Sequence, residues 1–116
     1  MELSEIEMSE EGVKEISRWR IPAPGNDDTY CEKNWMPIND MPYHYVKWTN
    51  PTEVVKVDPI NKTCETVVLK TQKLDIGRDL RGGSSIIKFG NYRIGITHEV
   101  DFWYNETEHK DCYYYH

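Results

Sequence analysis

Short runs of β-branched and aromatic residues, each closed by a turn signal, are the feature that most restricts the fold of this 116-residue chain. Tyr43–Trp48 alternates in this way, and Glu53–Val57 and Cys64–Leu69 are two Val-rich runs separated by a loop. Such runs, with turns about every 8–12 residues, are typical of all-β domains. The sequence therefore predicts an all-β, antiparallel fold (a sandwich, a barrel or a propeller), with Glu53–Leu69 as its clearest hairpin.

The other segments give weaker signals. Residues 1–29 are an acidic N-terminal segment followed by a Pro/Gly loop, and we expect the first twelve residues to be frayed or loosely helical. Val13–Trp19 fits a strand or one helical turn. Residues 71–84 are expected to form a loop, Ser85–Thr97 a second hairpin, and Asp101–Asp111 a polar excursion.

Charge and composition restrict the partners and the compartment. The formal net charge of −6 argues against nucleic acid or an anionic membrane as the main partner. No stretch approaches the roughly 20 apolar residues that span a bilayer. The acidic N-terminus lacks the apolar region of a signal peptide, and three cysteines cannot form a complete disulfide framework. We therefore expect an intracellular, cytoplasmic protein.

Two glycines beside an arginine, Arg81-Gly82-Gly83, form the strongest candidate for a binding turn. Glycine permits close approach of the backbone to a ligand, and the guanidinium offers a planar fork of donors for oxyanions or paired hydroxyls. The hairpin that follows ends at His98, so we expect Arg81 and His98 to lie at neighbouring strand ends and to face one ligand. The alternative is that the glycines only form a turn and Arg81 is a surface residue.

The order of several motifs resembles a known family. They are Glu32-Lys33-Asn34-Trp35-Met36-Pro37, a Tyr-rich strand, a Val-rich hairpin around Asp58, Leu80-Arg81-Gly82-Gly83-Ser84, Thr97-His98-Glu99 and a closing Tyr-Tyr-His. Over residues 30–116 they resemble five-bladed β-propeller proteins related to glycoside hydrolase family 130, the mannoside phosphorylases and hydrolases. The likeness is closer still to a glycosyltransferase-associated branch. About two blades are present, so we expect residues 30–116 to be an incomplete propeller and the chain to be a fragment.

The resemblance implies six substrate-binding residues: Lys33, Asn34, Arg81, Gly82, Gly83 and His98. In the family, the lysine of a blade-opening motif faces the sugar or anion in the central funnel, and a glycine-rich turn precedes a strand that ends in a histidine. The arginine belongs to the variant found in the glycosyltransferase-associated branch. The family's general-acid aspartate has no matching motif in residues 1–29, so the catalytic residue stays unknown.

Three neighbours could support this site. Asp79 could orient Arg81 or act as an acid or base, Glu99 could accept a hydrogen bond, and Glu32 could pair with Lys33. Trp35 and Trp48 could stack on sugars, but burial in a core is favoured for both. No histidine or cysteine pair has zinc-finger spacing, so we expect no metal and no cofactor.

The predicted function is the binding or processing of a glycan or sugar phosphate, with a linked glycosyltransferase or further propeller blades as partners. Three classes stay open: a glycosidase or glycoside phosphorylase whose catalytic carboxylate lies elsewhere, a glycan-binding module without chemistry, and a non-catalytic β-domain that pairs with a partner through its edge strands.

Overall fold

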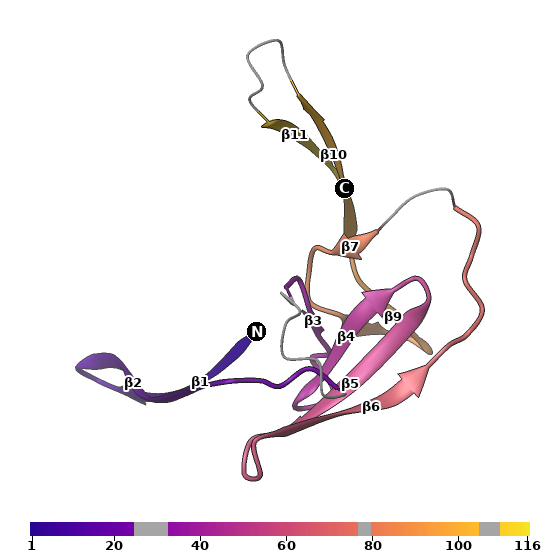
Figure 1. Ribbon diagram of the computed structural model, residues 1–116. Helices are drawn as coiled ribbons and strands as arrows, with labels where there is room; N and C mark the ends of the chain where they lie inside the picture. Colours follow the sequence, from indigo (N-terminus) through magenta and orange to yellow (C-terminus); the bar gives the residue numbers. More distant parts are fainter. Residues whose placement is uncertain (25–32, 77–79, 105–109) are drawn as a thin grey trace.

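The computed structural model describes residues 1–24, 33–76, 80–104 and 110–116, and within them the regular structure is entirely strand (Figure 1). The strands are β1 (Glu2–Ser9), β2 (Gly12–Arg20), β3 (Met36–Pro37), β4 (His44–Thr49), β5 (Thr52–Asp58), β6 (Thr63–Leu69), β7 (Arg81–Gly82), β8 (Ile87–Phe89), β9 (Tyr92–Ile94), β10 (Thr97–Tyr104) and β11 (Lys110–Tyr115). All pairings between these strands are antiparallel, so the all-β, antiparallel prediction is confirmed. The described strands form four sheets and no closed barrel or propeller, so the propeller arrangement stays a prediction. Among the same residues no helix is long and apolar enough to span a membrane.

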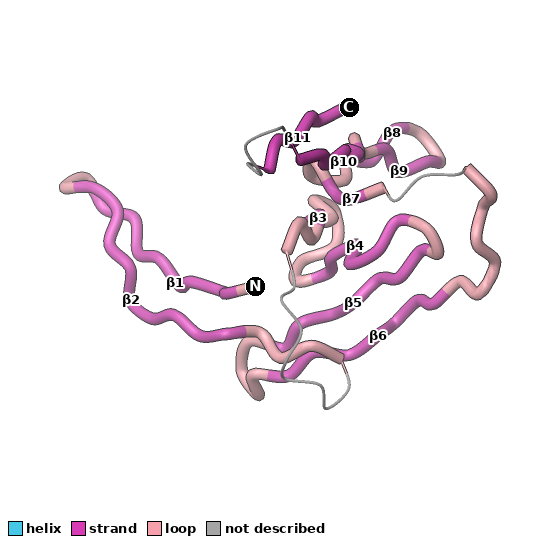
Figure 2. The backbone as a smooth tube through the Cα atoms, turned by 45° about the horizontal axis from the view of Figure 1, so that its top comes forward, coloured by secondary structure: helices cyan, strands magenta, loops and turns pink. Residues whose placement is uncertain are grey.

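The largest sheet is a four-stranded meander in the order β3-β4-β5-β6 (Figure 2). The predicted Val-rich hairpin is confirmed, since β5 and β6 pair from Asp58 opposite Thr63 to Glu53 opposite Leu69. In the central strand β5, Val55 and Val57 are 0% and 1% exposed and the intervening Lys56 is exposed. This alternation follows the two-residue period of a strand and buries one face of the sheet.

Two small clusters of side chains make up the core. The first contains Ile21, Trp35, Val55 and Val57. Trp35 is 5% exposed, which confirms its predicted place in the core, and its ring lies 6.0 Å from that of Tyr45. Burial raises the pKa of the Tyr45 phenol. Trp48 is half-buried on β4.

The second cluster joins the meander to the glycine-containing segment. It consists of Met36, Ile38 and Ile86. The Ile86 N–H donates to the Pro37 carbonyl at 2.7 Å, and the Asn39 N–H donates to the Ile86 carbonyl at 3.0 Å. Because apolar packing and backbone bonds coincide here, the chain just before β8 is held against β3 and the residues that follow it.

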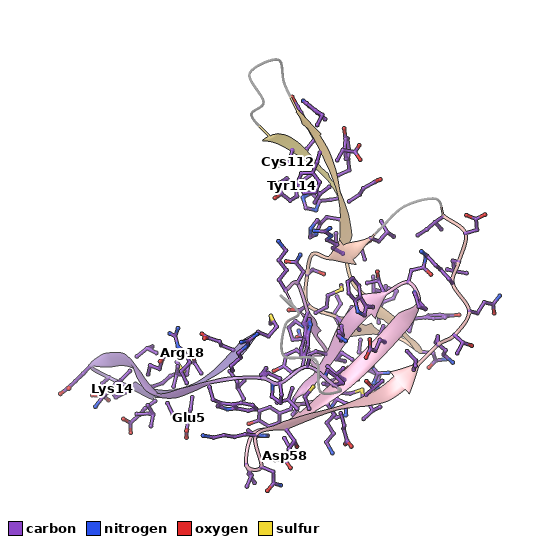
Figure 3. The ribbon with its side chains drawn as sticks, viewed as in Figure 1. Glu5, Lys14, Arg18, Asp58, Cys112 and Tyr114 are labelled. Carbon is purple, nitrogen blue, oxygen red and sulfur yellow. The ribbon has the colours of Figure 1, made fainter. Side chains whose placement is uncertain are left out.

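The prediction that the first twelve residues are frayed or loosely helical is wrong. They form β1 and the turn of a hairpin with β2. Gly12 allows the tight turn, with φ of 131°. Arg18 on β2 offsets part of the acidity, since it donates to Glu2 at 3.3 Å and to Glu15 at 2.7 Å. Figure 3 shows Glu5, Lys14 and Arg18 on this arm, which extends away from the meander. The strand reading of Val13–Trp19 is the one the structure adopts.

Two predictions for the C-terminal half also need correction. Within the expected loop of residues 71–84, Arg81 and Gly82 form the short strand β7, which pairs with β10. The expected polar excursion Asp101–Asp111 contains the end of β10 and the start of β11, with residues 105–109 lying outside the described part. The predicted second hairpin is confirmed as β8–β9, although its second strand stops at Ile94.

The molecule is extended for its length. Its radius of gyration is 17.0 Å, whereas a compact chain of this length has about 13 Å. The β1–β2 and β10–β11 hairpins project from the rest of the chain (Figure 1) and expose large apolar side chains. An isolated two-stranded hairpin is marginally stable in water, so both arms gain by packing against another surface.

Candidate functional site

All six predicted binding residues line one open pocket of about 540 Å³. It lies between the segment before β3, the strand β7 and the facing side of β10 and β11. Its lining is Lys33, Asn34, Arg81, Gly82, Gly83, His98, Val100, Phe102, Tyr114 and His116. The two halves of the site are nearly 50 residues apart in the sequence and are brought together by the fold.

Arg81 and His98 are placed by strand pairing. They are opposite each other in the antiparallel pair of β7 and β10, and Gly82 is opposite Thr97. Side chains of directly opposed residues project from the same face of a sheet. The Thr49 hydroxyl donates to the Leu80 carbonyl at 2.9 Å and so ties the start of β7 to the end of β4. The predicted proximity of Arg81 and His98 is therefore present in the structure.

The glycines permit this close packing. A Cβ atom on Gly82 would overlap the Asn34 carbonyl oxygen and the Met36 side chain. One on Gly83 would lie 3.0 Å from the Ile96 carbonyl oxygen and 3.4 Å from Nδ1 of His98. The Gly83 N–H already donates to that Ile96 oxygen at 3.0 Å. Gly82 is therefore required for backbone approach to the segment before β3, beyond forming a turn.

Lys33 and Asn34 enter the pocket from the residues just before β3. Asn34 has φ of 64°, a left-handed conformation that asparagine tolerates better than most residues. Directly after it, Trp35 and Met36 are buried in the two core clusters. The core anchors this segment and Asn34 reverses it, while the Lys33 side chain stays exposed at the pocket.

The aromatic and second imidazole groups of the pocket were not predicted. His98, Val100 and Phe102 alternate along one face of β10, and Tyr114 on β11 is opposite Val100. The ring of His98 is 5.8 Å from that of Tyr114 and 5.9 Å from that of His116. The two-residue alternation from His98 to Phe102 was a usable signal, but the neighbouring acidic residues concealed it.

None of the three predicted supporting residues, Glu32, Asp79 and Glu99, is among the described lining of the pocket. Glu99 is absent from the lining residues, and alternation along β10 directs it to the face opposite His98. On that opposite face, the rings of Trp103 and Tyr113 stack 4.2 Å apart. Glu32 and Asp79 lie outside the described residues.

An ion pair between β9 and the turn after β3 holds the β8–β9 hairpin that leads into β10. The Arg93 guanidinium donates to the two Asp40 carboxylate oxygens at 3.0 and 2.8 Å. These hydrogen bonds lower the pKa of the Asp40 carboxyl. The Ile96 N–H donates to the Ser84 hydroxyl oxygen at 2.8 Å, which fixes the approach to His98.

The pocket brings together side chains that are able to bind anions and hydroxyl groups. Lys33 and Arg81 bring two positive charges to the pocket of a chain whose net charge is −6. Asn34 and the imidazoles add hydrogen-bonding groups, and Phe102 and Tyr114 add aromatic surface. Among the described residues no group of three or more histidine, cysteine or acidic side chains is placed to hold a metal ion.

In a comparison with known proteins, no family model, curated protein or solved structure matches this chain.

Proposed function

We propose that the Arg81–His98 pocket binds a glycan or a sugar phosphate. The single observation that carries this proposal is that six residues selected from the sequence line one pocket, although they come from three separate segments. A sugar phosphate would place its anionic group between Lys33 and Arg81. Hydrogen bonds from these two cations to a phosphate are charge-assisted and therefore stronger than bonds between neutral groups. Its hydroxyls would meet Asn34 and His98, and its C–H face would meet Phe102 or Tyr114.

Binding is favoured over autonomous catalysis. The described lining holds cations, imidazoles, an amide and aromatic rings, and no acidic side chain is among those residues. Glycoside hydrolysis generally uses two carboxyl groups that flank the scissile bond. In the enzymatic version of the proposal, those groups come from residues outside the described lining, in further blades or in a partner.

The propeller architecture belongs to the same proposal. A four-stranded antiparallel meander is the unit from which β-propellers are built, and β3-β4-β5-β6 has that order. The parallel contact of Ile38 with Ile86 would then join the inner edge of this blade to the next segment. We propose a binding pocket at the junction of two blades in a glycosyltransferase-associated or glycoside hydrolase-like propeller.

A thermal-shift panel tests the proposal. Mannobiose, α-mannose 1-phosphate and inorganic phosphate are added to the wild type and to Arg81→Ala. A ligand at 100 times its dissociation constant should stabilise the protein by about 2.7 kcal/mol. The expected result is stabilisation that is lost in Arg81→Ala and kept in Arg20→Ala, which removes an exposed arginine outside the pocket. Equal stabilisation of both variants would reject the assignment of the ligand to this pocket.

A second candidate function, pairing with a partner through an edge strand, is favoured by β6. It is the edge of the four-stranded sheet, and Val67, Val68 and Leu69 are 42%, 40% and 62% exposed. It has no proline or lysine to discourage pairing. Light scattering after gel filtration should then show association that Val68→Lys abolishes, whereas a concentration-independent monomer would reject this candidate.

A further inference from the structure

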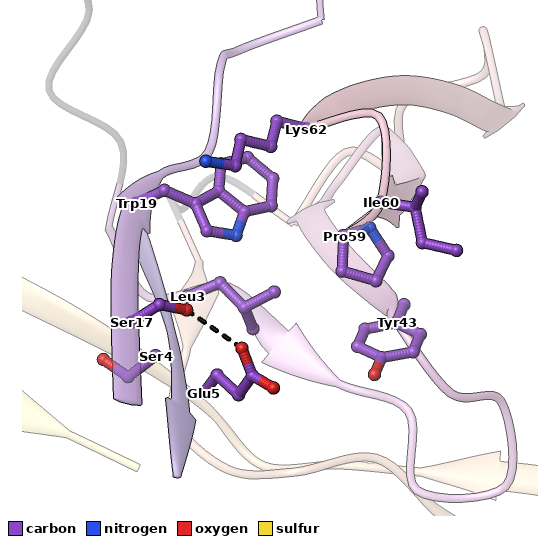
Figure 4. Close-up of a pocket in the computed structure, with 9 residues that line it drawn as sticks. All are labelled: Leu3, Ser4, Glu5, Ser17, Trp19, Tyr43, Pro59, Ile60 and Lys62. Carbon is purple, nitrogen blue, oxygen red and sulfur yellow. Dashed lines mark hydrogen bonds between the residues drawn. The ribbon is translucent and has the colours of Figure 1, made fainter. Parts of the chain in front are cut away.

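A second pocket, of about 410 Å³, lies between the N-terminal hairpin and the meander (Figure 4). It shares no lining residue with the Arg81–His98 pocket. One wall comes from β1 and β2, and the other comes from Tyr43 and the turn between β5 and β6. Nothing in the function proposed above uses this pocket.

Strand pairing sets the composition of the hairpin wall. Leu3 is opposite Trp19 and Glu5 is opposite Ser17, so all four side chains project from the same face. The Ser17 hydroxyl donates to Oε2 of Glu5 at 3.0 Å, which orients the carboxylate. Trp19 is half-buried against the first core cluster and still lines the pocket.

The opposite wall is held by backbone geometry. The Asp58 carboxylate accepts hydrogen bonds from the N–H groups of Ile60 and Asn61 at 2.9 and 3.0 Å, which fixes the β5–β6 turn. The carbonyl of Tyr43 accepts a hydrogen bond from the Val57 N–H at 2.9 Å. The aromatic surface of this wall therefore sits on a constrained backbone, which lowers the entropic cost of binding a ligand.

The polar groups of the pocket balance one another. Glu5 supplies a carboxylate and Lys62 an ammonium, so the lining carries no net charge. Because the two charges offset each other, a strongly charged ligand of either sign gains no net attraction from this lining. A purely apolar ligand would remove both from water without a replacement partner, which is costly.

A neutral sugar ring satisfies every one of these requirements. Its hydroxyl groups can donate to the Glu5 carboxylate and accept from the Lys62 ammonium. Its partly positive C–H face complements the negative face of the Trp19 indole. A proline-rich peptide would also suit the aromatic rings, but it lacks N–H donors at its prolines for Glu5.

We propose that the pocket between Trp19, Glu5 and Lys62 is a second carbohydrate-binding site, which takes one neutral pyranose ring of a glycan. The site is independent of the Arg81–His98 pocket, so either proposal can fail without the other.

An NMR titration of the full chain tests this proposal. The probes are mannotriose, cellotriose and chitotriose, with a proline decapeptide as the competing ligand class. The resonance of the Trp19 indole N–H, assigned with Trp19→Phe, should shift saturably with at least one trisaccharide. Affinity should fall by about tenfold or more in Glu5→Gln. Glu10→Gln, at the hairpin turn, should leave the affinity unchanged, and Arg81→Ala reports any binding in the other pocket.

Three results would overturn the proposal. One is no saturable shift with any trisaccharide up to about 10 mM, a concentration well above a millimolar dissociation constant. Another is binding of the proline decapeptide alone, which would assign the pocket to a peptide. The third is trisaccharide binding that Glu5→Gln leaves intact and Arg81→Ala removes, which would place the sugar in the other pocket.

Discussion

Arg81 and His98 are directly opposed in the two-residue pairing of β7 with β10, and both line the same pocket. Short strands seldom position side chains well by themselves. Here β7 is held on three sides: by β10, by the Thr49 hydroxyl and by the packing of Gly82 against the residues before β3. The geometry of the candidate site therefore depends on backbone contacts as much as on its polar side chains.

Replacing Gly82 should damage the site through the backbone. In Gly82→Ala the new methyl group would overlap the Asn34 carbonyl oxygen, so β7 must move away from the segment before β3. We expect a loss of about 1–3 kcal/mol in the free energy of unfolding, measured with urea. Gly90→Asn is the matched control, because Gly90 has open space around it and φ of 58°. A loss in Gly82→Ala no larger than in this control would contradict the packing described here.

Asn34 allows backbone and side-chain roles to be separated. Asn34→Gly keeps the left-handed conformation and removes the amide, so it should weaken ligand binding and leave the fold intact. Asn34→Ala removes the same amide and strains the backbone, at a cost of about 1 kcal/mol in stability. Calorimetric titration and urea unfolding of both variants measure the two effects. Equal stability of the two variants would argue against the left-handed conformation.

The first core cluster should be sensitive to small cavities. Val55 is 0% exposed, and Val55→Ala should lower the free energy of unfolding by about 2 kcal/mol. The same change at Val13, which is 64% exposed on the N-terminal arm, should alter it by less than about 0.5 kcal/mol. Comparable effects at the two positions would mean that β5 is not the centre of the core.

The turn between β5 and β6 should confer pH-dependent stability. Hydrogen bonds from Asn61 and Ile60 lower the pKa of Asp58 below its unfolded value of about 3.9. A lowered folded pKa stabilises the protein above the unfolded pKa, and this contribution is lost as the pH falls through the folded pKa. The stability difference between wild type and Asp58→Ala should therefore be present at neutral pH and shrink below about pH 4. A difference that grows in acid would contradict the assignment.

The sequence predicted best where local pattern and burial agree. The meander was predictable because Val55 and Val57 alternate with polar residues and turn residues bracket each run. The N-terminal hairpin was not, because its acidic residues suggest a solvated tail and Arg18 offsets part of that acidity only once the strands pair. A strand whose partner supplies the compensating charge cannot be identified from its own composition.

For the site, the residue types were predictable from the sequence, but the face of β10 that points to the pocket was not. Arg81 and His98 were proposed from their chemistry and spacing and Lys33 from the family resemblance, and the fold brings all three to one pocket. Glu99 is not among the lining residues and Phe102, which is, was overlooked, since which face of β10 points to the pocket depends on its pairing with β7. A shift of one residue in that pairing would exchange the two faces.

The most direct test of the central claim is a backbone-amide NMR titration with α-mannose 1-phosphate. We expect saturable shifts at the amides of Asn34, Arg81, Gly83 and His98, which are lost in Arg81→Ala and kept in Arg20→Ala. Saturable binding that leaves these four amides unmoved, or no binding of this ligand or of mannobiose to the folded protein, would contradict a glycan site in the Arg81–His98 pocket.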